Sequence, residues 1–313
     1  MKQTMALNAG RHKKGYIRKR LKESWQWYLL LLPGLIYLII FAYGPMYGVQ
    51  IAFKNYRASK GIWGSEWVGI KHFIRFIQYP NFWKMIKNTL SITLYSLATF
   101  PCAIIFALFL NEVKQIRFKK AVQMITYMSH FLSEVVVCSL VILFLDRNAG
   151  PINNLIEFLG GERTAFMGIA SAFSSIYVLS GLWKSLGWNS ILYISALSSI
   201  SMEEVEAAKI DGASRLQVLW HINIPGILPT VIITFLLRVG GIMNLGYTKT
   251  LLLQNDLNLD ASTILSTYTY EIGLIGGQYS YSAAIGLFNN IVNIVVMLIV
   301  NQISKRVSQT SLF

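Results

Sequence analysis

Long stretches almost without charge are the feature that most restricts how this chain can fold. Three of them contain no charged residue and three contain one each; they cover residues 24–53, 88–111, 272–304, 121–145, 167–202 and 222–248. The three single charges are Glu134, Lys184 and Arg238. About 20 mostly apolar residues are enough for a helix to cross a bilayer. Because the runs are continuous and lack the alternation of a membrane β-barrel, they predict helices.

The composition agrees with a membrane protein. Of 313 residues, 54% are hydrophobic and 13% are charged, and the mean hydropathy is +0.48. These values are too apolar for an ordinary soluble domain. We therefore predict an all-α polytopic membrane protein with a single transmembrane domain over residues 25–313. Its six spans are expected at about 26–50, 88–110, 121–145, 168–198, 226–250 and 280–304.

The distribution of Lys and Arg predicts the orientation. Residues 1–24 contain eight of them, the densest basic run of the chain. Basic residues favour the cytoplasmic side, so residues 1–24 are predicted to be a basic cytoplasmic arm. Six spans then return the C-terminus to the cytoplasm. The net charge of +14 is thereby explained by orientation and by contact with anionic membrane lipid rather than by nucleic acid.

No pattern of catalytic, metal-binding or nucleotide-binding residues is evident. Cys102 and Cys138 lie inside apolar runs and predict neither a disulfide nor a metal site. The segment most similar to a phosphate-binding loop is residues 64–69. It is followed by Ile70, where the motif requires Lys. We expect no enzyme activity and no cofactor in this chain; any ATP and Mg²⁺ would be bound by another subunit.

A polar insert over residues 201–225 separates the fourth and fifth predicted spans. Ser201 with Glu204, and Ser214 with Gln217, have the spacing of capping boxes and predict the starts of two short helices. Gly212 lies between them, where the chain must turn tightly. The insert is therefore predicted to be a helix, turn, helix elbow, called here the coupling segment. A plain amphipathic connector lying on the membrane is the alternative.

The same insert carries a family resemblance. Glu206-Ala207-Ala208, three residues, Gly212, nine residues and then Ile222-Asn223-Ile224-Pro225 resemble the EAA loop of binding-protein-dependent ABC importer permeases, with Ile224 where the family more often has Leu. The resemblance implies that the coupling segment docks on an ATPase. The residues it assigns to ATPase coupling are Glu206, Ala207, Ala208, Gly212, Ile222 and Pro225.

What the resemblance implies about partners follows from that family. Such a permease resides in the bacterial cytoplasmic (inner) membrane and pairs with a second homologous permease. Two ABC ATPase subunits bind below, and an extracytoplasmic solute-binding protein delivers the cargo. Residues 187–190, 196–206 and 43–56 are similar to the sugar branch, specifically to its maltose-permease-like permeases for complex oligosaccharides. The implied cargo is an oligosaccharide.

The resemblance also indicates a substrate path, on the spans just before and just after the coupling segment. Together with the charges inside spans, it gives the candidates Lys184, Ser185, Trp188, Asn189, Arg238, Gly241, Asn244 and Tyr247. Trp188 offers a flat face for sugar stacking, and Asn189 or Asn244 could supply paired donor and acceptor groups. If residues 238–248 are helical, Gly241, Asn244 and Tyr247 share a face from which Arg238 points away.

Several alternatives stay open at this point. Gly240 and Gly241 are equally compatible with helix packing, whereas Trp188 and Asn244 are favoured as cavity residues; Glu134, Lys184 and Arg238 are compatible with internal ion pairs. If Lys184 and Arg238 instead face the path, their positive excess over Glu134 suggests a uronate-containing oligosaccharide. A permease for amino acids or metals would use the same coupling segment. A secondary transporter with Glu134 as its ion site, or a channel or receptor, would not require it.

Overall fold

The computed structural model describes residues 24–308, which form two compact units divided between Gly69 and Ile70. The sequence predicts one domain over 25–313, so this division is a difference from the prediction. The predicted basic arm over residues 1–24 lies, except for Ser24, outside the described residues.

The first unit is a helical segment followed by a small hairpin. Helices α2 (Trp25–Tyr37) and α3 (Gly44–Met46) belong to one helical stretch that extends to Phe53. Strands β1 (Lys54–Arg57) and β2 (Ser65–Trp67) pair antiparallel around α4 (Gly61–Gly64), with Lys54 opposite Trp67. The side chains of α2 are all exposed within the chain, as expected for a helix that faces lipid. The hairpin is an exception to the predicted all-α fold.

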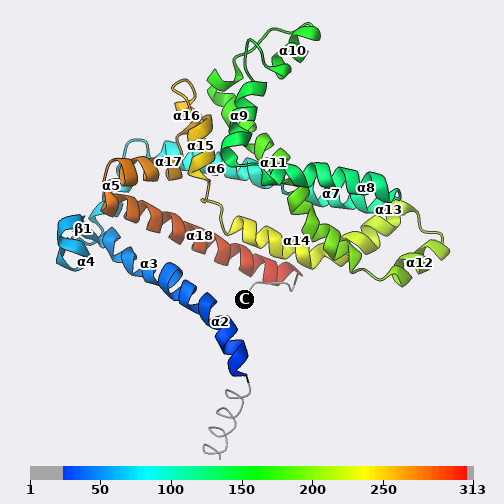
Figure 1. Cartoon of the computed structure of the whole chain (residues 1–313), viewed down its shortest axis with the longest axis horizontal. Helices are drawn as coiled ribbons and strands as arrows, with labels where there is room; N and C mark the ends of the chain where they lie inside the picture. Colours follow the sequence, from blue (N-terminus) through cyan, green and yellow to red (C-terminus); the bar gives the residue numbers. More distant parts are fainter. Residues whose placement is uncertain (1–23, 309–313) are drawn as a thin grey trace, which may run out of the picture. The chain divides into compact units, whose positions relative to one another are not determined.

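The second unit contains helices and no strand within the described residues, and it includes the longest helices (Figure 1). Its helices are α5 (Lys71–Ile77), α6 (Phe82–Ala98), α7 (Phe100–Glu112), α8 (Ile116–Met128), α9 (Glu134–Phe144), α10 (Pro151–Phe158), α11 (Phe173–Ser198), α12 (Met202–Ile210), α13 (Arg215–Val218), α14 (Ile224–Val239), α15 (Tyr247–Leu253), α16 (Leu259–Ser262), α17 (Leu265–Tyr270) and α18 (Tyr279–Ser308). Helix α11 packs against α7, α8 and α14, and α14 packs against α18.

Four helical stretches in the described chain are long and apolar enough to cross a membrane. They are Trp25–Phe53, Phe82–Glu112, Arg215–Val239 and Tyr279–Arg306, and the bent pair Ile116–Phe131 and Glu134–Phe144 makes a fifth if it is one span. Helix α11 has 26 residues, a length of about 39 Å at the usual rise per residue. The count of six crossings stays a prediction.

The expected span over residues 121–145 is not one straight helix. The chain bends by 105° between α8 and α9. Ser133 begins α9 as its N-cap, because its Oγ accepts a hydrogen bond from the Val136 backbone N–H at 3.2 Å. Glu134 then occupies the first turn, where the helix dipole favours an acidic residue. Ser133 and Glu134 therefore start a new helix inside an apolar run.

The expected span over residues 226–250 also ends early. Helix α14 stops at Val239, turns follow, and α15 begins at Tyr247. Gly240 and Gly241 fall at the stop, and glycine is a poor helix former because it loses the most backbone entropy. The Met243 backbone N–H is bonded instead to the Asn293 side chain of α18. The early stop places a non-helical segment beside α18.

Small residues bring α11 close to its neighbours. A Cβ on Gly187 would lie 2.6 Å from the backbone carbonyl carbon of Thr126 on α8, so only glycine fits at this contact. On its other side α11 contributes Tyr193 to a buried cluster with Ala107 of α7 and Ile227 of α14. Close approach through small residues is typical of packed membrane helices. This packing holds the walls of the candidate site.

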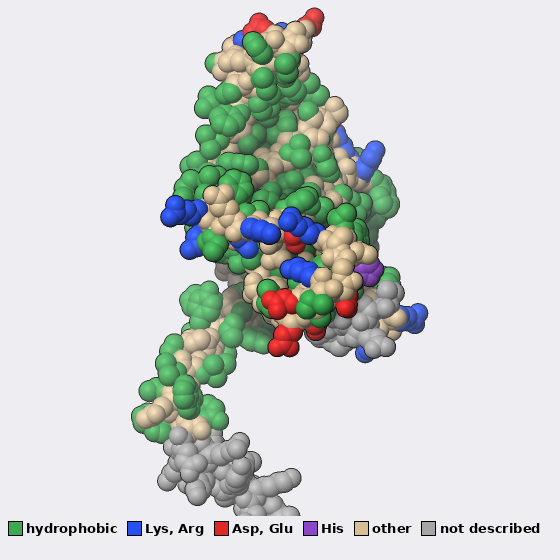
Figure 2. Space-filling model, turned by 90° about the vertical axis from the view of Figure 1, so that its right-hand side faces the viewer, with side chains coloured by type: hydrophobic (Ala, Val, Ile, Leu, Met, Phe, Trp, Pro, Cys, Tyr) green, Lys and Arg blue, Asp and Glu red, His purple; other side chains and the backbone are tan. Residues whose placement is uncertain are grey.

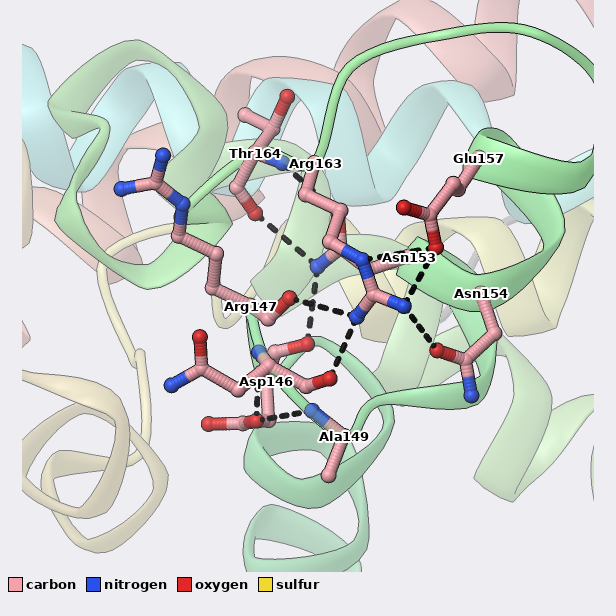
Figure 3. A network of polar contacts seen from close by, with 9 residues as sticks. Asp146, Arg147, Ala149, Asn153, Asn154, Glu157, Arg163 and Thr164 are labelled. Carbon is pink, nitrogen blue, oxygen red and sulfur yellow. Dashed lines mark hydrogen bonds and ion pairs between the residues drawn. The ribbon is translucent and has the colours of Figure 1, made fainter.

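A polar network closes the loop that carries α10 (Figure 3). Arg163 donates to the Asn148 carbonyl and to Asn154 Oδ1, and its Nη2 lies 2.6 Å from Glu157 Oε2. The hydrogen bond from Arg163 holds the pKa of Glu157 below its ordinary value. The backbone N–H groups of Ala149 and then Asn148 do the same for the pKa of Asp146. The loop is therefore braced at its base.

Candidate functional site

The coupling segment has the predicted local structure. Helix α12 begins directly after Ser201, although the Ser201 side chain makes no capping hydrogen bond in the described structure. Gly212 has a φ of +85°, a left-handed conformation that glycine adopts without strain. Ser214 N–H donates to Gln217 Oε1 at 2.7 Å and Gln217 N–H to Ser214 Oγ at 3.4 Å. This second capping box is complete and starts α13.

The segment presents an exposed surface of mixed character. Glu206, Ala207 and Pro225 are exposed, whereas Ala208 and Ile222 are half-buried. Apolar side chains lie open beside them: Met202, Ile210 and Leu216 are 65%, 86% and 69% exposed. Figure 2 shows the end of the molecule that carries α12, with acidic side chains gathered next to Lys and Arg. An open surface with apolar and charged groups is suited to contact with a partner protein.

Pro225 lies within the helix that follows the coupling segment. Helices α13 and α14 form one helical stretch from Arg215 to Val239. Helix α13 is therefore continuous with an apolar helix long enough to cross a bilayer.

Three cavities in the second unit share Arg238 as a lining residue. Their volumes are about 130, 320 and 340 Å³. Of the candidate path residues, Ser185 lines the smallest, Trp188 the second, Asn189 both of these, and Gly241 and Asn244 the third. Lys184 and Tyr247 line none of the three. The structure thus places five of the eight candidates on cavities that a sixth, Arg238, also lines.

Arg238 is held by a serine that the sequence does not single out. Its Nη2 donates to Ser96 Oγ at 2.9 Å and to the Ser96 carbonyl at 3.3 Å, which joins the end of α14 to α6. None of the described residues that line the three cavities is acidic. Arg238 therefore supplies a positive charge that no carboxylate in the cavity walls neutralises.

Lys184 is in a different situation. Its Nζ lies 2.5 Å from Glu134 Oε2, and the two side chains are 18% and 32% exposed. The ion-pair alternative is confirmed for Lys184 with Glu134, whereas within residues 24–308 Arg238 bonds Ser96 and no acid. Another cation, Lys249, is buried, and its Nζ donates to the Tyr177 carbonyl at 2.8 Å. The sequence reading missed it because Lys249 lies just beyond an apolar run.

The aromatic candidates are stacked within the chain. Trp188 lies parallel to His130, with ring centroids 4.3 Å apart, and 42% of Trp188 is exposed. Tyr247 stacks on Tyr270 at 4.8 Å. One face of each candidate ring is therefore covered by a neighbouring ring, and a sugar could stack only on the other.

Asn244 lies on the same cavity as Arg238, contrary to the helical-wheel expectation. That expectation assumed a helix through residue 248, but α14 ends at Val239 and the chain turns, so Arg238, Gly241 and Asn244 line one cavity of about 340 Å³. Asn244 Oδ1 also accepts hydrogen bonds from Asn289 and Asn293 of α18. Both the cavity role and the cross-helix bonding that the sequence left as alternatives occur at this residue.

The candidates predicted from the sequence do not include several residues that line the cavities. Thr93, Ser96 and Tyr177 line the cavities, and Thr234 shares a hydrogen bond of 2.9 Å with Tyr193. Their signal in the sequence is weak, because isolated hydroxyl side chains in an apolar run also occur where a helix bonds its own backbone.

Comparison with known proteins gives a consistent result. The family described as "binding-protein-dependent transport system inner membrane component" matches residues 79–309. Protein LplB of Bacillus subtilis is 42% identical over 293 residues, which are 93% of this chain and 92% of LplB. The polygalacturonan/rhamnogalacturonan transport system permease protein YteP of the same organism is 41% identical over 287 residues, 91% of this chain and 89% of YteP.

Two solved structures share the fold. One is a bacterial ABC transporter involved in the import of the acidic polysaccharide alginate, with a TM-score of 0.85 and 37% identity over 93% of this chain and 99% of that chain. The other is a bacterial alginate ABC transporter in complex with an alginate pentasaccharide-bound periplasmic protein, with the same TM-score and identity over 94% of this chain and 99% of that chain.

Proposed function

The chain belongs to the family of binding-protein-dependent transport system inner membrane components, and from this premise we propose that it is the permease subunit of an ABC importer for oligosaccharides that carry uronate groups. One observation carries the uronate assignment: Arg238 lines all three cavities, and no acidic residue lines them among residues 24–308. A fixed guanidinium with spare donors is a natural partner for a carboxylate.

The related proteins support this cargo class. The structure with a TM-score of 0.85 to this chain belongs to an importer of the acidic polysaccharide alginate, and YteP is the permease protein of a polygalacturonan/rhamnogalacturonan transport system. A neutral sugar could accept hydrogen bonds in the same cavities but would not neutralise the charge of Arg238. Both the positive charge of the cavity and the related proteins therefore favour an acidic oligosaccharide as the cargo.

The proposed assembly follows from the family. We propose that the chain crosses the bacterial cytoplasmic membrane six times, with both termini in the cytoplasm; the four apolar stretches, the bent pair α8 and α9, and α11 supply the crossings. It pairs with a second homologous permease, two ABC ATPase subunits and an extracytoplasmic solute-binding protein. ATP and Mg²⁺ bind to the ATPases, and this chain contributes no catalytic residue.

The coupling segment is proposed to transmit the movement of the ATPases. Its exposed apolar side chains on α12 and α13 would fill a cleft of the partner, and Glu206 would pair with a basic residue there. Because α13 continues into α14, a rigid-body movement of α13 would reach Arg238 at the other end of the same stretch. Closure of the ATPases would thereby reorient the cavity.

The cargo assignment is tested by uptake into proteoliposomes that contain the complete importer with its binding protein. An oligouronate and its methyl ester have the same chain length and differ in charge. We expect uptake of the free acid to exceed that of the ester by at least tenfold, because a charge-assisted hydrogen bond contributes about 1.5–3 kcal/mol. Equal rates for the two would remove the uronate assignment.

The coupling assignment is tested by charge reversal. In Glu206→Lys we expect the ATPase to be strongly depleted when the tagged chain is copurified from native membranes, while the second permease is retained. Glu162→Lys makes the same charge change at an exposed residue in the loop before α11 and is the matched control. Mass spectrometry quantifies both partners. An ATPase that stays bound at its normal level to the Glu206 variant contradicts the docking role.

A further inference from the structure

We infer that Asn293 and Asn289 of α18 fix the side-chain amide of Asn244 so that only its donor group faces the Arg238 cavity, and that this makes the cavity a carboxylate subsite. The inference rests on the proposed function, since it concerns how the same permease recognises its cargo. It assigns a role to two residues that do not line the cavity.

The orientation of the three amides follows from one unambiguous donor. A backbone N–H can only donate, so the Met243 N–H, 2.9 Å from the side chain of Asn293, must meet the oxygen of that amide. The Asn293 nitrogen then points the other way and donates to Asn244 Oδ1 at 2.9 Å. Asn293 is buried, with 5% of its surface exposed, so water cannot replace this partner. The Asn293 amide is therefore locked by the backbone.

Asn289 reinforces the same orientation of Asn244. Its Nδ2 donates to Asn244 Oδ1 at 3.1 Å, so the Asn244 oxygen accepts two hydrogen bonds and has no acceptor capacity left for a ligand. Turning the Asn244 amide over would place its NH₂ group against two other NH₂ groups and lose both bonds. The buried Oδ1 of Asn289 has no hydrogen-bond partner in the described structure. This unpaired acceptor is a cost that the hydrogen bonds to Asn244 Oδ1 must offset.

The orientation of the Asn244 amide determines which ligand groups the cavity favours. Asn244 is exposed and lines the cavity of about 340 Å³ together with Arg238. With its oxygen occupied, Asn244 offers the cavity an NH₂ group, and Arg238 offers a guanidinium; both can only donate. A carboxylate can only accept, whereas a sugar hydroxyl also needs an acceptor for its proton. The two nitrogen groups therefore favour a uronate carboxylate over a hydroxyl or an ester.

Asn293 acts through Asn244 and is a positioning residue, so its test needs a readout of specificity. In Asn293→Asp, the carboxylate still accepts from Met243 N–H, but its second oxygen now requires a donor from Asn244. The Asn244 amide is expected to turn over and present its oxygen to the cavity. We expect the uptake ratio of oligouronate to its methyl ester in the assembled importer to fall about tenfold, the value of one charge-assisted hydrogen bond.

Two further variants distinguish the effect of the added negative charge from the effect of the Asn244 amide orientation. Asn290→Asp adds the same charge at an exposed position of α18 and should leave the ratio unchanged. Asn293→Leu removes the lock without adding charge and should lower the ratio severalfold. If the Asn293 variants fail to assemble, Asn244→Ala removes the donor itself at an exposed position and should lower the ratio equally.

The outcomes distinguish this inference from the proposed function. If the unmodified importer does not prefer the free acid over the ester, the proposed function itself fails. If it does prefer the acid, and the assembled Asn293 and Asn244 variants keep the full preference, the cargo class stands and the donor-only subsite is overturned.

Discussion

Replacing Arg238 by Gln is expected to reduce uptake of the oligouronate about a hundredfold while changing uptake of its methyl ester by only a few fold. Removing one partner of a desolvated, hydrogen-bonded charge pair costs about 2–5 kcal/mol, and each 1.4 kcal/mol corresponds to a factor of ten. Glutamine retains a donor for Ser96 Oγ, which holds the Arg238 guanidinium at 2.9 Å, so the contact between α14 and α6 can persist. The variant therefore removes charge more than it removes packing.

The comparison of two cargoes separates recognition from assembly. Arg238→Lys keeps the charge but lacks the planar fork, so it should give an intermediate loss for the free acid. Arg147→Gln removes an exposed positive charge in the loop before α10 and is the control. Uptake is measured in proteoliposomes and normalised to the amount of assembled complex. An equal loss for acid and ester would show that Arg238 supports the helices or the movement rather than the carboxylate.

The sequence predicts the apolar helices well because the membrane leaves few choices. A backbone in lipid must satisfy its hydrogen bonds internally, so an apolar run long enough to cross becomes a helix. This reasoning does not locate breaks inside a run. Ser133-Glu134 and Gly240-Gly241 lie inside predicted spans, yet the first begins a new helix and the second follows the end of one. Both breaks have local signals that the run of apolar residues concealed.

The turn and the second helix start of the coupling segment were predictable for the opposite reason, although Ser201 makes no capping hydrogen bond in the described structure. Its structure depends on local contacts: the capping box of Ser214 with Gln217, and the left-handed conformation of Gly212 between the two helices. Interactions between residues a few positions apart can be read directly from spacing. Only the docking role requires knowledge of a partner, and it stays a prediction.

The cavity walls could not be predicted from spacing. Ser96 meets Arg238 across 142 positions of sequence, and Asn293 meets Asn244 across 49. Such contacts depend on how the helices pack, and a single sequence gives no measure of packing. The sequence shows how many charged residues the apolar runs contain, but it does not show which cation is neutralised by a carboxylate. Lys184 is paired with Glu134, whereas Arg238 lines the cavities.

The ion pair between Lys184 and Glu134 is expected to be a major structural element, so that Lys184→Met alone lowers stability by about 3–5 kcal/mol. The two side chains join α11 to the start of α9, and they are only 18% and 32% exposed. Losing the ammonium leaves a carboxylate without its partner in a region of low polarity, which is the costly part of the change. We expect a clear drop in the melting temperature of the purified complex in detergent and in the yield of assembled importer.

A double variant reveals whether Lys184 has a second role. Glu134→Gln combined with Lys184→Met removes both charges, and replacing a whole buried pair is often neutral or stabilising. We expect the double variant to recover stability and most oligouronate uptake, because Lys184 lines none of the three cavities. Lys120→Met, at an exposed position of α8, controls for the loss of a lysine.

Two results would contradict this account in different ways. If Lys184→Met alone is as stable as the unmodified chain, the ion pair does not hold α9 against α11. If the double variant recovers its melting temperature but still fails to import the oligouronate, Lys184 acts on the cargo in a conformation where the pair has opened. Because the two measurements respond to different properties, stability and uptake together assign the residue to packing or to the substrate path.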